Sequence, residues 1–475
     1  MRTPWFPVAV ITLVAAALRC WLGLVVYPGA GYRADLELFV QWAAAARDHG
    51  LTSVYAVDSS ANYPPVGVAA MGAMAWLAGD HATWLPTLVK LPAVVADVLC
   101  VPLAAGLAHA IAPQKRRTSA AVMAAGLLAL TPVLWYDSAL WGQLDALVTV
   151  FTLAALVCWT KGWSELAAIA GVLATMAKPQ GVLVLVVLAV AVLATHLVRQ
   201  RWRLLTTLLA GAATGLGLLT LFRYRVLAPG LEHTPVWGDL VGFWRQSLTT
   251  VDLYPNLSAN AYNLWALVGE PPLVSVFNGG IDTWLPDSWG LFTGTPFATS
   301  AHVAGLVLLG VATLVVVAGL VRRHDGADVV LATVVLGFCF FALPTRSHER
   351  YLVTNIAVAA AWAAASWWRV GLHAIAGAMN LVNLHAVLGS SARQWERSRQ
   401  RTDVPGGPGG GGPGPGGGGP GGFPGDGSTP TQILLPWGDQ ARLEIVGRVV
   451  SVGQTALAVA LLAAWIVHVA RPRPR

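Results

Sequence analysis

The sequence predicts an all-α polytopic membrane protein with about twelve transmembrane helices, and interfacial helices in its first extracytoplasmic loop. Of its 475 residues, 56% belong to the set Ala, Val, Ile, Leu, Met, Phe, Trp, Tyr and Cys, and only 11% are charged. A typical soluble domain has about 25% charged residues. The mean hydropathy is +0.61, and many of the apolar runs approach the ~20 residues that a helix needs to cross a bilayer. These observations exclude a soluble protein.

The apolar runs predict the crossings in chain order. We expect them near residues 8–28, 86–111, 119–135, 144–160, 164–177, 180–198, 203–221, 300–321, 328–343, 351–368, 371–389 and 445–470. The run Val66 to Gly79, after Tyr63-Pro64-Pro65, is too short for a comfortable crossing at about 1.5 Å per residue, so we expect it to lie on the membrane surface. The run 164–177 is also short, but it is counted as a crossing.

Basic residues set the predicted orientation. With Val66–Gly79 on the surface, the basic loop residues all fall on one side, which the positive-inside rule makes cytoplasmic. They are Arg2, Lys115–Arg117, the segment 196–203, Arg322 and Arg323, Arg369, and the 471–475 tail. The net charge of +7 is the usual excess of such anchors, so nucleic acid is not expected as a partner.

The crossings divide the chain into seven segments. They are a first helix (1–28), an extracytoplasmic loop with juxtamembrane helices (29–85), a block of spans (86–221), a long extracytoplasmic loop (222–299), further spans (300–389), a loop (390–444), and a last span with a basic tail (445–475). Within the loop 390–444, residues 405–427 are Gly and Pro except for Phe423 and Asp426. Such a composition cannot bury apolar surface, so we expect this insert to be disordered.

The first extracytoplasmic loop contains a one-sided helix. Leu36, Phe39, Val40 and Ala43 recur at helical spacing, which is typical of a helix lying in the interface. Asp35 stands at its beginning. It either caps this helix or serves as a carboxylate base at the membrane surface, and position alone does not separate the two. Glu37 is the second candidate for the base.

Five polar motifs interrupt the apolar pattern on the extracytoplasmic side, or close to it. They are Asp35, Trp42, Gly50 and Tyr55 followed by Asn62-Tyr63-Pro64-Pro65; Leu91–Asp97; Trp141-Gly142-Gln143-Leu144-Asp145; Lys178-Pro179-Gln180; and His348-Glu349-Arg350. In this order they resemble the GT-C glycosyltransferases. The similarity is to the endoplasmic-reticulum glucosyltransferases that use dolichyl-phosphate glucose, and still more to bacterial polyprenyl-phosphate-sugar mannosyltransferases. It covers roughly residues 1–370.

The resemblance implies a GT-C fold with Asp35 as the catalytic base, and with Lys178, His348, Arg350 and the nearby Arg346 around the donor phosphate. A lipid phosphate leaves with negative charge, which cations stabilise. Lys178 has an alternative as a helix-terminal cation beside free carbonyls. An alternative role, as an anchor of the loop, applies to Arg346, His348 and Arg350. However, these residues lie on the side where the positive-inside rule predicts few cations.

Seven further residues are candidates for substrate binding: Glu37, Tyr63, Gln143, Asp145, Gln180, Asn260 and Asn263. Gln143 and Asp145 have an alternative as caps of the helix beginning near Leu144. Gln180 has one as a partner for backbone left free by Pro179. Asn260 and Asn263 belong to a stretch that resembles the bacterial enzymes. The tryptophans of the 222–299 loop favour an interfacial belt over a sugar platform.

The resemblance therefore implies an enzyme, a hexosyltransferase that moves mannose or glucose from a polyprenyl-phosphate sugar to a lipid-linked glycan or another extracytoplasmic acceptor. We expect the donor, a glycan or glycolipid acceptor and membrane lipids as partners, and neither metal nor cofactor. The composition is typical of a GC-rich bacterium, so we expect the bacterial cytoplasmic membrane. The alternative is a lipid-linked sugar flippase, but we find no internal repeat, and the polar motifs gather at one face.

Overall fold

The structure is a computed structural model. It describes residues 3–198, 200–268, 285–402, 430–433 and 440–472. The predicted disordered insert 405–427 lies outside these residues. The described chain is mostly helical and has only four short strands, which confirms an all-α polytopic membrane protein.

Seven helical segments of the described chain are long and apolar enough to cross a membrane. They are α1 (Trp5–Cys20) with the π-helix η1 (Trp21–Val26); the short η3 (Ala82–Trp84) and α5 (Leu85–Leu88) with α6 (Leu91–Ile111); η6 (Pro179–Gly181) with α11 (Val182–His196); α12 (Arg201–Leu221); α14 (Ala301–Arg322); α17 (Trp367–Thr402); and α18 (Gln440–Ala470).

An eighth span results if two bent segments count as one crossing. The segment Gln114–Leu130, which is η4 (Gln114–Arg116) with α7 (Arg117–Leu130), meets Pro132–Trp141, which is α8 (Pro132–Trp135) with the π-helix η5 (Tyr136–Trp141), at 43°. Pro132 lies at the break, and its missing N–H removes a helical hydrogen bond there.

Four of the predicted crossings form helices of only 11 to 17 residues. They are α9 (Asp145–Thr160), α10 (Ser164–Ala177), α15 (Gly326–Ala342) and α16 (Val353–Ala363). All four pack against longer helices inside the bundle. Length and composition thus show seven or eight spans, and the count of twelve stays a prediction.

Small residues allow the central helices to approach closely. Buried alanines form much of the facing surfaces of α6 and α7, a packing mode that membrane bundles favour. On α15, a Cβ added at Gly337 would overlap the Asn355 side chain of α16, so only glycine fits at this contact.

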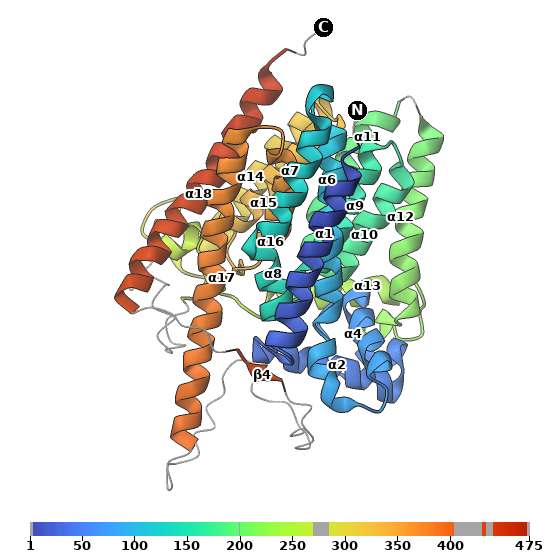
Figure 1. Ribbon diagram of the computed structural model, residues 1–475, viewed down its shortest axis with the longest axis vertical. Coiled ribbons are helices and arrows are strands. Elements are labelled where there is room, and N and C mark those ends of the chain that lie inside the picture. The colour runs from blue at the N-terminus through green and yellow to red at the C-terminus, as the bar shows by residue number, and fades with distance from the viewer. Residues whose placement is uncertain (1–2, 199, 269–284, 403–429, 434–439, 473–475) are drawn as a thin grey trace.

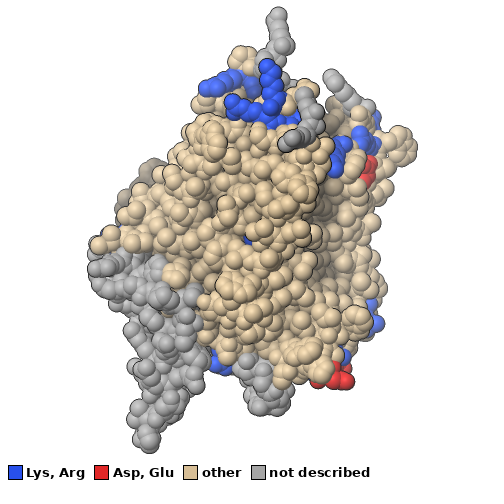
Figure 2. All heavy atoms as spheres, viewed as in Figure 1, with Lys and Arg blue, Asp and Glu red and all other residues tan. Residues whose placement is uncertain are grey.

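The two ends of the bundle differ. Both chain termini lie at one end, and α2 (Arg33–His49), α4 (Pro65–Ala78), α13 (Trp237–Val251) and β4 (Thr431–Gln432) lie at the other (Figure 1). Figure 2 shows lysine and arginine residues gathered at the end with the termini, beyond a broad band with almost no charged residues. We call the end that holds α2 the loop end.

Short elements complete the loop end. They are η2 (Leu51–Ser53), α3 (Val54–Val57), η7 (Tyr224–Leu227) and η8 (Leu264–Leu267), with an antiparallel pair of strands β2 (Gly290–Leu291) and β3 (Thr299–Ser300). On α13, Trp237 and Trp244 are exposed, in keeping with an interfacial belt, whereas Trp265 is buried and donates to the Leu343 carbonyl. Trp284 lies outside the described residues.

A second pair of strands connects distant parts of the chain. β4 pairs in parallel with β1 (Ala30–Gly31), which immediately precedes α2. The Thr431 amide donates to the Gly29 carbonyl at 3.0 Å, and the Ile433 amide donates to the Gly31 carbonyl at 2.9 Å. The segment before α18 is therefore fastened to the start of the helix that carries Asp35.

Candidate functional site

Asp35 lies in the first turn of α2 with its side chain half-buried. Its Oδ2 atom accepts hydrogen bonds from Trp141 Nε1 at 2.8 Å and Gln143 Nε2 at 2.6 Å. The Tyr32 side chain at the N-cap makes no capping hydrogen bond, and Asp35 Oδ2 accepts from Trp141 and Gln143, so the structure does not support capping as the role of Asp35. Glu37 pairs instead with Arg33 at 2.6 Å, and both side chains are about one-third exposed.

A turn after η5 brings Trp141 and Gln143 to Asp35. The Asp137 carbonyl accepts from the amides of Gly142 and Gln143, each at 3.0 Å. Gly142 has a φ of +88°, which favours glycine, and an added Cβ would lie 2.6 Å from Leu36 Cδ2. The spacing Trp-Gly-Gln is thus required by the backbone turn and by close contact with α2.

Asp145 and Lys178 form a buried ion pair beside this turn. Lys178 Nζ lies 2.7 Å from Asp145 Oδ2, and the two side chains are 4% and 1% exposed. Gln180 Nε2 donates to the other carboxylate oxygen at 2.6 Å. Burial is the largest single influence on the pKa of Lys178 and lowers it, but Asp145, Tyr63 and Asp137 together outweigh it, so the pKa is raised and the amine stays charged.

Gln143 connects this ion pair to Asp35. Its Nε2 donates to Asp35, while its Oε1 accepts from Lys178 Nζ at 2.9 Å and from the Tyr63 hydroxyl at 3.1 Å. The Lys178 ammonium also lies 5.0 Å from the centre of the Tyr63 ring. The Gln143 side-chain amide therefore fixes the position of the Asp35 carboxylate relative to the Lys178 ammonium.

The loop between α15 and α16 contributes a second cation. Arg350 NH1 contacts Glu349 Oε1 at 2.8 Å, and its Nε lies 3.9 Å from Asp145 Oδ2. Among the described residues, the buried Arg350 Nε has no hydrogen-bond acceptor within reach, and the buried Glu349 Oε2 has no donor. A buried donor without a partner costs about 1–3 kcal/mol, which favours a ligand oxygen at this position.

His348 lies beside Arg350 and is mostly buried. Its ring packs edge-on against Tyr254 and Tyr351, with centroids 5.0 and 5.2 Å apart. Burial, followed by the charges of Arg350 and Lys178, holds the pKa of His348 well below its ordinary value, so the ring is neutral near pH 7. Burial raises the pKa of Glu349.

Arg346, which the sequence analysis grouped with Lys178 and Arg350, forms ion pairs with two carboxylates of the 222–299 loop. It adopts a left-handed backbone, with a φ of +62°. Its Nε contacts Asp287 Oδ2 at 2.6 Å, and its NH1 contacts Asp252 Oδ1 at 2.5 Å. The structure places Arg346 in ion pairs with the 222–299 loop, and its role at the donor phosphate stays a prediction.

Asn260 and Asn263 fasten loops together. Asn260 has a φ of +69°, and its backbone forms a bridge with His348. Asn263 Nδ2 donates to the Phe341 carbonyl at 3.1 Å, and its Oδ1 accepts from the Trp265 amide at 3.0 Å. These contacts give Asn263 a structural role and leave Asn260 next to the site.

The sequence analysis missed three side chains that position the site. Asn380 and Asn383, both buried on α17, donate to the carbonyls of Glu349 at 2.9 Å and Asn260 at 2.8 Å. Gln432 Oε1 accepts from the Arg33 amide at 3.1 Å, at the first residue of α2. Two asparagines three residues apart in an apolar helix indicate a buried polar contact, so the sequence could have revealed Asn380 and Asn383. No feature of the sequence indicates a role for Gln432.

A separate ion pair lies deeper in the bundle. Arg19 Nε lies 2.8 Å from Asp97 Oδ2, both side chains are fully buried, and the Ser138 hydroxyl donates to the same oxygen at 2.8 Å. It connects α1, α6 and η5. Asp97 belongs to one of the five motifs, and the structure gives it this packing role.

No protein-family model matches the chain, and a comparison with curated proteins found no match. Within the described residues, no group of three or more His, Cys, Asp or Glu side chains is arranged to hold a metal ion.

Proposed function

We propose that the chain is a membrane glycosyltransferase of the GT-C type, which transfers a hexose, mannose or glucose, from a polyprenyl-phosphate sugar to a glycan or glycolipid acceptor. One observation carries the proposal. Gln143 contacts both Asp35 and Lys178, so a half-buried carboxylate and a buried cation are positioned together at one membrane end.

Asp35 suits the role of base. In the transfer, the acceptor oxygen forms a bond to the anomeric carbon while the bond from that carbon to the phosphate oxygen breaks. The acceptor hydroxyl loses its proton, and Asp35 Oδ1 is available to take it because the Trp141 and Gln143 donors both engage Oδ2. Those two bonds stabilise the charged carboxylate and orient it.

Arg350 and Lys178 suit the leaving phosphate. The buried Arg350 Nε has no acceptor in the part of the chain that the structure describes, and a guanidinium can bind two phosphate oxygens together. Lys178 is also held charged. The carboxylates of Asp145 and Glu349 balance these cations in the absence of donor, so we infer that the phosphate shares the cations with them.

The same proposal includes the topology. The four short helices α9, α10, α15 and α16 complete about twelve crossings, because they pack alongside the longer spans. The arginine- and lysine-rich end in Figure 2 faces the cytoplasm. The loop end, with Asp35, then faces the extracytoplasmic side of a bacterial cytoplasmic membrane.

Sugar transfer by the purified protein tests the function. Wild type and Asp35→Asn are compared in detergent with radiolabelled polyprenyl-phosphate mannose and polyprenyl-phosphate glucose, a membrane-lipid extract as acceptor, and EDTA throughout. We expect product from wild type alone. Equal product from both proteins removes Asp35 from the mechanism. No product, together with flipping of labelled lipid in proteoliposomes, replaces the transferase with a flippase.

A further inference from the structure

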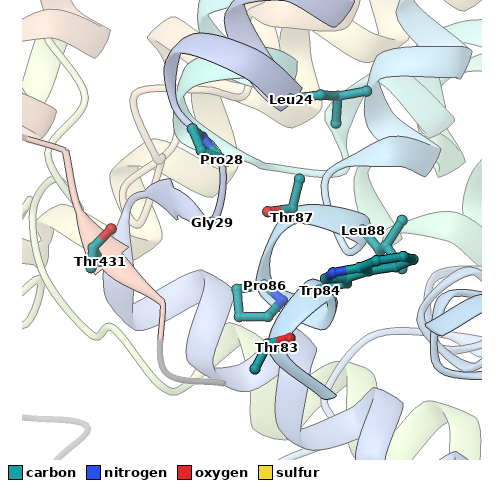
Figure 3. A pocket seen from close by; sticks show the side chains of 9 residues that line it. All are labelled: Leu24, Pro28, Gly29, Thr83, Trp84, Pro86, Thr87, Leu88 and Thr431. Carbon is teal, nitrogen blue, oxygen red and sulfur yellow. The ribbon is translucent and has the colours of Figure 1, made fainter. Parts of the chain in front are cut away.

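A pocket of about 530 Å³ opens at the loop end, between Gly29, the residues just before α6 and Thr431 (Figure 3). Its wall includes Gly29, Thr83, Trp84, Thr87 and Thr431. Asp35 does not line it. The volume lies within the range of small-molecule sites, about 300–1,000 Å³.

Three distant segments build this pocket. Gly29 has a φ of +63°, and a Cβ added there would lie 3.2 Å from Pro86 Cβ, so the turn before β1 is packed against the residues just before α6. Thr431 closes the opposite wall, because its amide donates to the Gly29 carbonyl. Figure 3 shows the Trp84 ring on one side of the opening and Thr431 on the other.

The lining has the chemistry of a carbohydrate site. Trp84 is 58% exposed. One face of its ring stacks on His81, with ring centroids 4.7 Å apart, so the opposite face is available to the C–H groups of a sugar ring. Thr83, Thr87 and Thr431 line the pocket, and within the described part of the chain their hydroxyls make no hydrogen bond to protein. Each hydroxyl can both donate and accept, which suits sugar hydroxyls.

The same lining disfavours other ligands. It contains neither Lys nor Arg, as a phosphate headgroup would require, and neither Asp nor Glu, as a cation would require. Trp84 also differs from a plain interfacial tryptophan, because three threonines line the pocket with it, beside the apolar Leu24, Pro28, Pro86 and Leu88. Trp76 on α4 is 85% exposed and does not line the pocket, so it represents the interfacial kind.

We propose that this pocket is a subsite for the acceptor glycan, which deepens the proposed function and rests on it. Gly29 precedes Asp35 by six residues, and Gln432, next to Thr431, caps the helix that carries Asp35. The pocket therefore holds a sugar of the acceptor other than the one that reacts. Acceptors of two or three sugars gain affinity from it, and single sugars do not.

Direct binding tests the subsite without any donor. Fluorescently labelled α-linked mannose and glucose saccharides, of one to three units, are titrated against purified protein in detergent. The variants are Trp84→Ala and Thr87→Val, with Trp76→Ala as the matched control. We expect Trp84→Ala to weaken trisaccharide binding about tenfold and Thr87→Val about fivefold, with Trp76→Ala unchanged. Size-exclusion profiles of the variants confirm that they are folded.

Transfer kinetics separate the two proposals. In the assay with lipid-linked acceptor, Trp84→Ala should raise the acceptor KM and leave the donor KM unchanged. Trisaccharide binding that depends on Trp84, in a protein that transfers no sugar, keeps the subsite and removes the transferase. If Trp84→Ala transfers sugar with an unaltered acceptor KM, the subsite proposal is overturned and the transferase proposal stands. Wild type that binds no saccharide, or an equal loss in Trp76→Ala, also overturns it.

Discussion

The buried pair of Lys178 and Asp145 offers the sharpest test of the site's electrostatics. Asp145→Asn leaves a buried ammonium with only the Gln143 oxygen as a strong partner. Lys178→Met leaves a carboxylate that keeps the Gln180 donor and has Arg350 Nε at 3.9 Å. Removing one partner of a buried pair costs about 3–5 kcal/mol, and we expect Asp145→Asn at the upper end and Lys178→Met at the lower.

The double variant should cost less than the sum of the single ones, because neither charge then remains unpaired. An unfolding entropy of about 2.1 cal/mol/K per residue gives about 1 kcal/mol/K for a chain of this length. The single variants should therefore lower Tm by about 3–5 °C in detergent, and the double variant by about 2–3 °C. Sugar transfer should be lost wherever Lys178 is absent, so restored stability does not restore activity.

The control is the exposed pair of Arg47 and Asp48, whose side chains are 40% and 52% exposed. Asp48→Asn should change the free energy of unfolding by less than about 1 kcal/mol. If the loss of stability in the double variant equals the sum of the two single losses, the reasoning is refuted. Such a result would mean that a buried charge left without its partner does not destabilise the fold. An equal loss in Asp48→Asn would refute it as well.

Four further predictions follow from single contacts. Asp35→Asn should reduce the transfer rate about 10²–10⁴-fold while donor binding, measured with labelled lipid, is retained. Gln432→Leu should lower kcat without changing the donor KM, since it uncaps the helix that carries Asp35, and Gln432→Glu should restore the rate because it keeps the acceptor. The pKa of His348 lies well below 6.5 in the folded chain. The neutral ring therefore contributes stability above pH 6.5, and this contribution is lost as the pH falls through the pKa of the folded state. Tm should decline less between pH 7.5 and 5 in His348→Gln than in wild type. Gly337→Ala should lower Tm at every pH through overlap with Asn355, and a Gly337→Ala protein as stable as wild type would show that α15 and α16 can separate.

The first loop shows how much of the site the sequence could predict. Leu36, Phe39, Val40 and Ala43 are all buried on α2, as their spacing predicts. At 100° per residue, Asp35 and Glu37 lie about 200° apart around the helix. Only one of them can therefore face the site, and the structure turns Asp35 toward it.

The polar motifs that the sequence analysis singled out lie close together in the structure. The structure brings Gln143, Asp145, Lys178, Gln180 and Arg350 into one network. Arg346 was grouped with them because it lies only four positions before Arg350. Arg346 pairs with Asp287 and Asp252, and its position in the sequence did not indicate these partners.

The contacts that fasten the site differ in how visible they are. An amide in an apolar helix must find a partner, so the pair of Asn380 and Asn383 on α17 marked a polar contact that the sequence analysis did not use. The pairing of β1 with β4 left no such mark. Its bonds join backbone groups that every non-proline residue has, across about four hundred positions. Gln432 acquires its partner only through that pairing. In a chain this apolar, buried polar side chains can therefore be read from the sequence, whereas the backbone contacts that place them require the fold.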